Sequence, residues 1–174
     1  MRVEHLVVAP LLAVDRSVEA MLERCSDRTV LERCGGGSPD AARLYLRTLL
    51  ERHRHTTVAG WREHQLVGVA TAVHEDNGSE LAVLVEDTWQ RRGIATALLT
   101  RLLADTAGPF PLRAQVTVAN TAALALLRRV APTARLDTLD AGVIEVEFNH
   151  APHDHMRRTS WQPTEPEPGP SLSA

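Results

Sequence analysis

The order of helices and strands that the sequence predicts is that of a mixed α/β fold. Along the chain we expect a strand, two helices, three strands, a helix, a strand, a helix and two final strands. One pair of helices thus surrounds a single strand in the second half of the chain. A doubly wound parallel sheet would alternate strands and helices throughout, so that class is excluded.

The first third of the chain predicts one strand and two helices. Residues 3–12 have the composition of a strand with a turn, and residues 17–23 that of a short helix. The segment 34–40 contains consecutive glycines and a proline, which predicts a loop. Ser38 or Asp40 can cap the helix that follows, because their side-chain oxygens accept backbone N–H groups. We expect this helix to end near residue 52.

Three strands are expected next. Residues 56–61 and 66–73 have strand-forming composition and are separated by polar residues, which predicts an antiparallel hairpin. The dipeptide Asn77-Gly78 predicts a second turn, since these residue types tolerate positive φ. A strand at residues 80–86 follows this turn.

The remaining elements are two helices and three strands. We expect a helix at residues 91–104 and a strand at residues 112–118. Asn120 caps a second helix, which ends near residue 130. Two short strands, at residues 134–139 and 142–148, then form a closing hairpin.

Beyond residue 148 the composition changes. Residues 149–174 are rich in Pro, Ser, Glu and His and show no periodicity, which is typical of a disordered tail. We therefore expect a single domain at residues 1–148, followed by this Pro- and His-rich tail.

Composition and charge exclude several functional classes. The formal net charge of −3 gives no electrostatic basis for binding nucleic acid or a membrane surface. All 19 basic residues are arginines, so the chain has neither a Schiff-base lysine nor a phosphate-loop lysine. Cys25 and Cys34 match no metal or redox spacing, and we predict no metal site. No apolar run is long enough to cross a bilayer, so a cytoplasmic location is expected.

The most informative segment for chemistry is a strand that leads through a short turn into a helix. The turn and helix start read Gln90-Arg91-Arg92-Gly93-Ile94-Ala95. Unpaired backbone N–H groups gather at a helix N-terminus and can bind a pyrophosphate. Gly93 permits close backbone approach, and the two arginines add positive charge. The alternative is an ordinary strand–helix connection with a solvated pair of arginines.

Two segments resemble the GNAT (Gcn5-related N-acetyltransferase) superfamily. Residues 90–95 are similar to its signature Gln/Arg-x-x-Gly-x-Gly/Ala, and residues 120–127 resemble its Asn-x-x-Ala-x-x-Leu/Phe-Tyr helix. The two segments occur in the family's order and on the expected elements. The resemblance covers about residues 3–148, and residues 80–99 are closest in style to actinobacterial protein-lysine acetyltransferase-like domains.

The resemblance implies a GNAT fold, with a mostly antiparallel central sheet that splays between its fourth and fifth strands. It also implies that acetyl-CoA, the co-substrate, lies between the strands at residues 80–86 and 112–118. A backbone N–H of the fourth strand would stabilise the oxyanion. Members of the family often form homodimers through their last strands. The implied cofactor-binding residues are Val83 and Val85 for the pantetheine arm, Gln90, Arg91, Arg92, Gly93, Ile94 and Ala95 for the pyrophosphate, and Asn120 beside the pantetheine.

Glu80 is the predicted catalytic base. An acceptor amine is mostly ammonium at neutral pH, since the pKa of lysine is about 10.4, and it must lose a proton before it attacks. Glu80 begins the strand that borders the cofactor, and it resembles the glutamate at this place in the lysine-acetyltransferase branch. The alternative for Glu80 is a solvated carboxylate after a turn. Glu86 is the second candidate, unless it only balances Arg91 or Arg92.

One residue departs from the family pattern. Many members carry a tyrosine after the position of Leu126, where it protonates the departing CoA thiolate, and this chain has Leu127 there. A thiol with a pKa near 8.5 can leave as thiolate without a general acid. Three functions therefore stay open: an N-acetyltransferase that acts on a protein lysine or a small amine, a non-catalytic acyl-CoA-binding or regulatory module, and an α/β interaction domain without a ligand. The charge pattern does not indicate the acceptor.

Overall fold

A computed structural model describes residues 6–11, 16–34, 37–51, 54–106, 111–139 and 142–148; the predicted tail at residues 149–174 lies outside these ranges. In chain order the elements are β1 (Leu6–Pro10), α1 (Arg16–Arg24), α2 (Asp27–Cys34), α3 (Pro39–Glu51), β2 (His55–Arg62), β3 (Gln65–Glu75), β4 (Gly78–Val85), the 3₁₀ turn η1 (Asp87–Trp89), α4 (Ile94–Asp105), β5 (Leu112–Thr117), α5 (Thr121–Val130), β6 (Arg135–Thr138) and β7 (Val143–Phe148).

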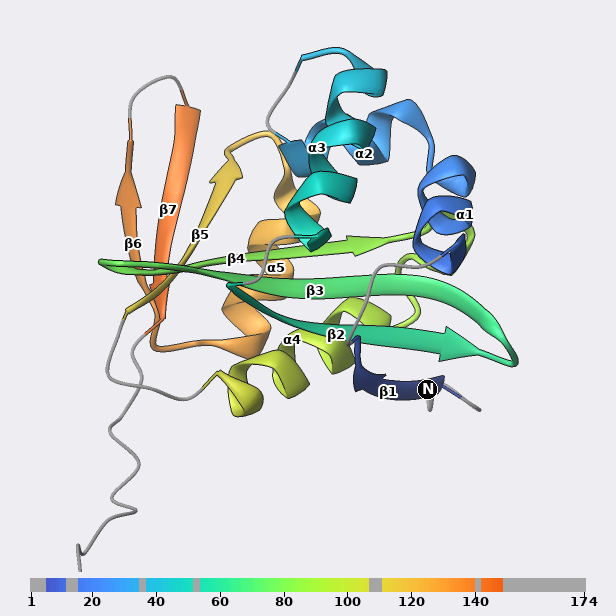
Figure 1. The fold of residues 1–174 in the computed structure, drawn as a ribbon. Coiled ribbons are helices and arrows are strands. Elements are labelled where there is room, and N and C mark those ends of the chain that lie inside the picture. The colour runs from blue at the N-terminus through green and yellow to red at the C-terminus, as the bar shows by residue number, and fades with distance from the viewer. Residues whose placement is uncertain are drawn as a thin grey trace, which may run out of the picture.

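The strands form one seven-stranded sheet in the order β1-β2-β3-β4-β5-β7-β6. Every neighbouring pair is antiparallel except β4 and β5, which are parallel. Helices α1, α2 and α3 cover one face of the sheet, and α4 and α5 cover the other (Figure 1). The predicted mixed α/β fold with a mostly antiparallel sheet is confirmed.

Each face of the sheet has its own apolar core. Residues Ile94, Leu98 and Leu102 of α4 pack against one face, together with Leu127 of α5. Residues of α1 and α3, among them Met21, pack against the other. Helix periodicity places such residues on one side of each helix, and their burial is the main favourable term in folding. No helix within the described ranges is both long and apolar enough to cross a membrane.

Most predicted elements are present, with two corrections. Helix α2 was not expected from the sequence, although Ser26 caps it, with Oγ accepting the N–H of Thr29 at 3.3 Å. The prediction that this helix begins at Arg91 is wrong, since α4 begins at Ile94. Arg91 and Gly93 have φ of 57° and 84°, and residues with these values cannot be part of a right-handed helix. The predicted cap by Ser38 is confirmed by the N–H of Ala41, which lies 3.2 Å from Ser38 Oγ.

The turn between β3 and β4 is built closely against the start of β5. Gly78 has φ of 150°, and a Cβ atom at this position would lie 2.7 Å from the carbonyl oxygen of Pro111. The adjacent Ser79 N–H donates to that same oxygen at 2.9 Å. Glycine at position 78 therefore allows β4 and β5 to meet at their first residues.

We predict that Gly78→Ala lowers the free energy of unfolding by about 1–3 kcal/mol, because it adds backbone strain and a clash with Pro111. Gly37→Ala is the matched control, since Gly37 also has positive φ but no atom of the described residues lies within 4 Å of the added Cβ. Urea denaturation of both variants separates the clash from the strain. Equal losses in the two variants would contradict a close contact between Gly78 and Pro111.

Candidate functional site

Strands β4 and β5 pair only at their N-terminal ends. The paired residues are Ser79 with Leu112 and Glu80 with Arg113. Beyond this point β5 pairs with β7 along its length, whereas β4 continues to Val85 beside β3. The predicted splay between the fourth and fifth strands is confirmed. We call the backbone edge of residues 81–85 that faces away from β3 the open β4 edge.

The hydrogen-bond alternation of β4 determines which backbone groups face this edge. In an antiparallel ladder, alternate residues direct their N–H and C=O groups toward the partner strand. The N–H of Glu86 donates to Val67 at 3.0 Å on the β3 side, while that of Ser79 points to Pro111 on the other side. Odd-numbered residues of β4 therefore present their backbone to the open β4 edge. Among them are Val83 and Val85, the two residues predicted to contact the cofactor.

The segment of residues 90–95 follows directly after this edge. Arg91 and Gly93 both adopt left-handed conformations, and Gly93 occupies the N-cap of α4 without a side-chain cap. The first N–H groups of a helix have no intrahelical partner, and a backbone of this kind collects N–H groups around one point. The arrangement suits an anion, and the positive end of the α4 dipole adds to it.

The Trp89 ring contacts two arginines, Arg62 and Arg92, near this segment. The guanidinium carbons of Arg62 and Arg92 each lie 5.0 Å from the centroid of the Trp89 ring. Such cation–π contacts orient a guanidinium without neutralising its charge. Arg62 Nε is buried and has no hydrogen-bond partner among the described residues. Arg91 and Arg92 are exposed, so their charges remain available to a ligand.

Gln90 ties the 90–95 segment to both neighbouring elements. Its Nε2 donates to the carbonyl oxygen of Val85 at 3.0 Å and to Oγ1 of Thr29 at 3.1 Å. The Val85 carbonyl is thus already used, and its N–H is the group that remains toward the open β4 edge. The side chain of Gln90 thus connects β4 to α2.

Asp87 forms a second link to α2. Its carboxylate accepts the N–H of Ser26 at 2.8 Å, the hydroxyl of Ser26 at 2.7 Å and that of Thr29 at 2.8 Å. Partial burial opposes ionisation of Asp87, but the hydrogen bonds from Ser26 and Thr29 outweigh it and hold its pKa below the ordinary value. The unpredicted helix α2 therefore helps to position the turn that precedes α4.

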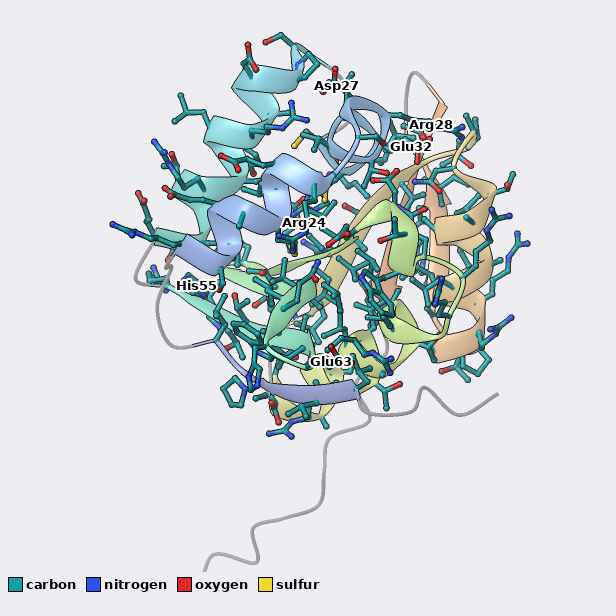
Figure 2. All side chains as sticks on the ribbon, turned by 90° about the vertical axis from the view of Figure 1, so that its right-hand side faces the viewer. Arg24, Asp27, Arg28, Glu32, His55 and Glu63 are labelled. Atoms are coloured by element: carbon teal, nitrogen blue, oxygen red, sulfur yellow. The ribbon has the colours of Figure 1, made fainter. Side chains whose placement is uncertain are left out.

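Glu86 is a structural carboxylate. It is 5% exposed, and its Oε2 accepts Arg24 Nε at 2.8 Å and Gln65 Nε2 at 3.2 Å. Figure 2 shows Arg24 between α1 and the sheet. The interpretation that Glu86 balances Arg91 or Arg92 is wrong, because its partner is an arginine 62 positions earlier in the chain. Arg24 also donates to the carbonyl oxygen of Leu66 at 2.7 Å.

Glu80 lies on the opposite face of the sheet from α4. Side chains alternate along a strand, so Glu80 shares a face with Ala82 and Leu84. Ala82 and Leu84 line an apolar pocket beneath the first three helices, together with Leu22, Arg33, Leu46, Leu50, Val69 and Thr71. Burial lowers the pKa of the Arg33 guanidinium, and the Glu80 carboxylate is among the groups that oppose this shift. Glu80 is exposed and close enough for its charge to act on Arg33.

Helix α5 carries one residue that lies as predicted and one that departs from the family pattern. Asn120 caps α5 as predicted, with Oδ1 accepting the N–H of Ala123 at 3.0 Å. This leaves the Asn120 amide nitrogen as a donor. Leu127 is 6% exposed and packs within the core beneath α4 and α5. The position where the resemblance expects a tyrosine thus holds a buried apolar side chain.

Comparison with known proteins identifies a family. The sequence profile described as "Acetyltransferase (GNAT) family" matches residues 20–131. Comparison with curated protein sequences gives no significant match.

Several solved structures share the fold. The GNAT domain of S. lividans PAT is 20% identical, with a TM-score of 0.67, over 81% of this chain and 88% of that domain. The ribosomal-protein-S18-alanine N-acetyltransferase of Escherichia coli is 16% identical, with a TM-score of 0.62, over 84% of this chain and 94% of that one. The spermidine N-acetyltransferase of Vibrio cholerae, solved with CoA and spermine, is 12% identical, with a TM-score of 0.63, over 85% of this chain and 97% of that one.

We predict that Arg24→Met lowers the free energy of unfolding by about 2 kcal/mol or more, because it leaves the buried Glu86 carboxylate without its cation. Arg28→Met is the matched control. Its ion pair with Glu32 is exposed, at 86% and 41% of the two side chains, and we expect no measurable change (Figure 2). Urea denaturation measures both. If Arg24→Met is no less stable than the control, Glu86 does not depend on Arg24.

Proposed function

Because the chain belongs to the acetyltransferase (GNAT) family, we propose that it transfers an acetyl group from acetyl-CoA to a primary amine, on a protein lysine or a small molecule. The observation that carries the proposal is the junction of the open β4 edge with the 90–95 segment. At this junction the unpaired backbone edge of β4 leads to the start of α4, where backbone N–H groups can bind an anion. An elongated ligand that carries a pyrophosphate can use both features at once. We also propose that the domain extends over residues 1–148, since the last residue of β7, Phe148, is buried.

The donor would bind along this junction. The N–H groups of Val83 and Val85 would pair with the amides of the pantetheine arm. The backbone of residues 90–95 would hold the pyrophosphate, with Arg91 and Arg92 adding charge. The Asn120 amide would contact the pantetheine from the β5 side. An N–H at the open β4 edge would stabilise the oxyanion that develops on the thioester carbonyl.

The acceptor would approach from the other face of the sheet, where Glu80 lies. An amine must be neutral to attack, and a carboxylate within hydrogen-bond reach can take the proton of the ammonium. Glu80 is exposed beside the apolar pocket, so it can meet an amine whose carbon chain enters from solvent. Separate faces for donor and acceptor allow both to be bound at the same time.

Direct attack fits the chemistry of the thiols. Burial raises the pKa of Cys25 to about 12, with the charges of Asp87 and Glu86 adding to the shift. Burial also raises the pKa of Cys34. A protonated thiol is a weak nucleophile, so neither cysteine is prepared to carry the acetyl group. Without an acid at Leu127, the CoA sulfur would leave as thiolate and take a proton from water.

We predict that Glu80→Gln lowers the rate of CoA release at pH 7 by on the order of a hundredfold with the fastest of three amines: a lysine peptide with blocked ends, spermidine and an aminosugar. The deficit should shrink as the pH approaches the amine pKa of about 10.4, because free amine then arrives from solution. Glu75→Gln is the control, since Glu75 is an exposed carboxylate on β3.

Thermal shift with CoA checks donor binding separately in every variant. Turnover by Glu80→Gln equal to that of the wild type at every pH would contradict the role of Glu80. Stabilisation by CoA without release of CoA from any of the amines would favour the non-catalytic acyl-CoA-binding module.

A further inference from the structure

A chain of hydrogen bonds crosses the apolar layer on the acceptor face. His55 Nε2 lies 2.9 Å from the carbonyl oxygen of Leu50, and His55 Nδ1 lies 3.0 Å from Thr57 Oγ1. Thr57 Oγ1 in turn lies 3.0 Å from Thr71 Oγ1. The chain therefore runs from a partly exposed imidazole through two hydroxyls. In Figure 2 His55 lies at the rim of the molecule, near the start of β2.

The inner end of this chain reaches the pocket next to Glu80. Thr57 and Thr71 are each 3% exposed, and Thr71 lines the apolar pocket. Thr71 pairs with Ala82 across β3 and β4, and Glu80 is the diagonal neighbour on the same face. Diagonal neighbours on a sheet are about 7–8 Å apart, so one amine nitrogen can lie between them. In general, replacing both partners of a buried hydrogen bond by apolar groups of the same shape can leave stability nearly unchanged.

The direction of the chain depends on the charge of His55. The Leu50 carbonyl can only accept, so Nε2 carries a proton in both charge states. In the structure Thr57 donates to Thr71 at 3.0 Å, the direction that a protonated ring requires, with Nδ1 donating to Thr57. When the ring is neutral, rotation of both hydroxyls lets Nδ1 accept from Thr57 and Thr57 accept from Thr71, and the lone pairs of Thr71 are then left for a donor in the pocket. In this rotated arrangement the chain can take up one proton from the pocket.

Acetylation of an ammonium removes two protons from its nitrogen, because the ammonium nitrogen carries three protons and the nitrogen of the amide product carries one. One proton must leave before the attack, and the second must leave as the C–N bond forms and the C–S bond breaks. The departing thiolate takes up one proton from water, so the overall reaction releases one proton to solvent. Glu80 can take the first proton, and a second group on the protein can carry the other from the nitrogen to water.

On the basis of the proposed function, we propose that Thr71, Thr57 and His55 form a proton relay that takes the second proton from the acceptor nitrogen. The nitrogen gives its proton to Thr71 Oγ1 while the Thr71 proton passes to Thr57 and the Thr57 proton to His55 Nδ1. One N–H bond breaks at the substrate, one forms at the ring, and each hydroxyl ends with one proton as before. The partly exposed ring then exchanges its extra proton with water.

The charged groups around His55 leave it free to serve this role. The preceding residue, Arg54, is paired with Asp76 at 3.2 Å. On β3 the residue opposite His55 is the apolar Val73, and the neighbouring His74 bonds instead to Thr56 at 2.9 Å and to Ser79 at 2.8 Å. Helix α3 contributes the Leu50 carbonyl and ends at the exposed Glu51.

The test is the pH profile of kcat for Thr57→Val and Thr57→Ser, measured on the full chain with the fastest of the three amines. Thr57→Val keeps the shape of the side chain and interrupts the relay. We expect kcat to fall tenfold or more, while KM for both substrates stays within about twofold. The relay predicts that kcat of the wild type declines toward acidic pH, and that Thr57→Val loses the part of this decline that depends on the relay. Thr57→Ser should restore both the rate and the profile.

Thr56→Val is the matched control. Thr56 makes the same kind of contact with a histidine but belongs to the chain of His74 and Ser79, which does not reach the pocket. We expect it to retain the wild-type kcat and pH profile. A Thr57→Val variant with wild-type kcat, or with the same loss as Thr56→Val, would overturn the relay and leave the proposed function intact. No CoA release with any amine would overturn both.

Nitrogen NMR of the His55 ring tests the direction of the chain without an acceptor. We expect the neutral ring to carry its proton on Nε2, and the Nδ1 resonance to shift in Thr57→Val. A neutral ring protonated on Nδ1 would overturn the relay, because Nδ1 could then take no proton from Thr57.

Discussion

The separation of β4 from β5 is the constraint on which the rest of the site depends. The two strands are joined only at Ser79 and Glu80, and Gly78 allows the close contact with Pro111 that holds this junction. Backbone N–H and C=O groups normally find partners within a sheet, so an unpaired edge in its middle is costly unless a ligand uses it. The strand order makes the edge internal, because β7 is the antiparallel partner of β5 on its other side.

Both layers of the fold support the end of this edge. On one face of the sheet, α4 begins at Ile94 after its N-cap Gly93 and directs its first N–H groups toward the turn. On the other face, α2 holds the turn through Asp87 and Gln90, and α1 holds Glu86 through Arg24. The segment of residues 90–95, which we propose binds the pyrophosphate, is thus fixed by side chains that would not themselves touch the ligand. Rigid support of this kind lowers the entropy lost when a ligand binds.

The local geometry on which the proposed site depends could be predicted in part from sequence patterns. The 90–95 segment and the cap at Asn120 lie on contiguous residues with known spacing, and the alternation of β4 makes Val83 and Val85 face the same edge. The partner of Glu86 could not be predicted, because Arg24 is distant in sequence and the contact depends on how α1 packs. Helix α2 was missed because only Thr29 and Val30 of its residues are buried, which leaves a weak apolar period. The chain from His55 to Thr71 likewise arises only when β2 and β3 pair.

The central claim is that the open β4 edge and the 90–95 segment bind the donor. Titration of the isotope-labelled protein with CoA, followed through backbone amide NMR, tests it most directly. The account predicts shifts of the amides of Val83 and Val85 and of those at the start of α4, with smaller shifts at Leu84, whose N–H faces β3. Shifts confined to other parts of the molecule, or no shifts at millimolar CoA, would contradict the account.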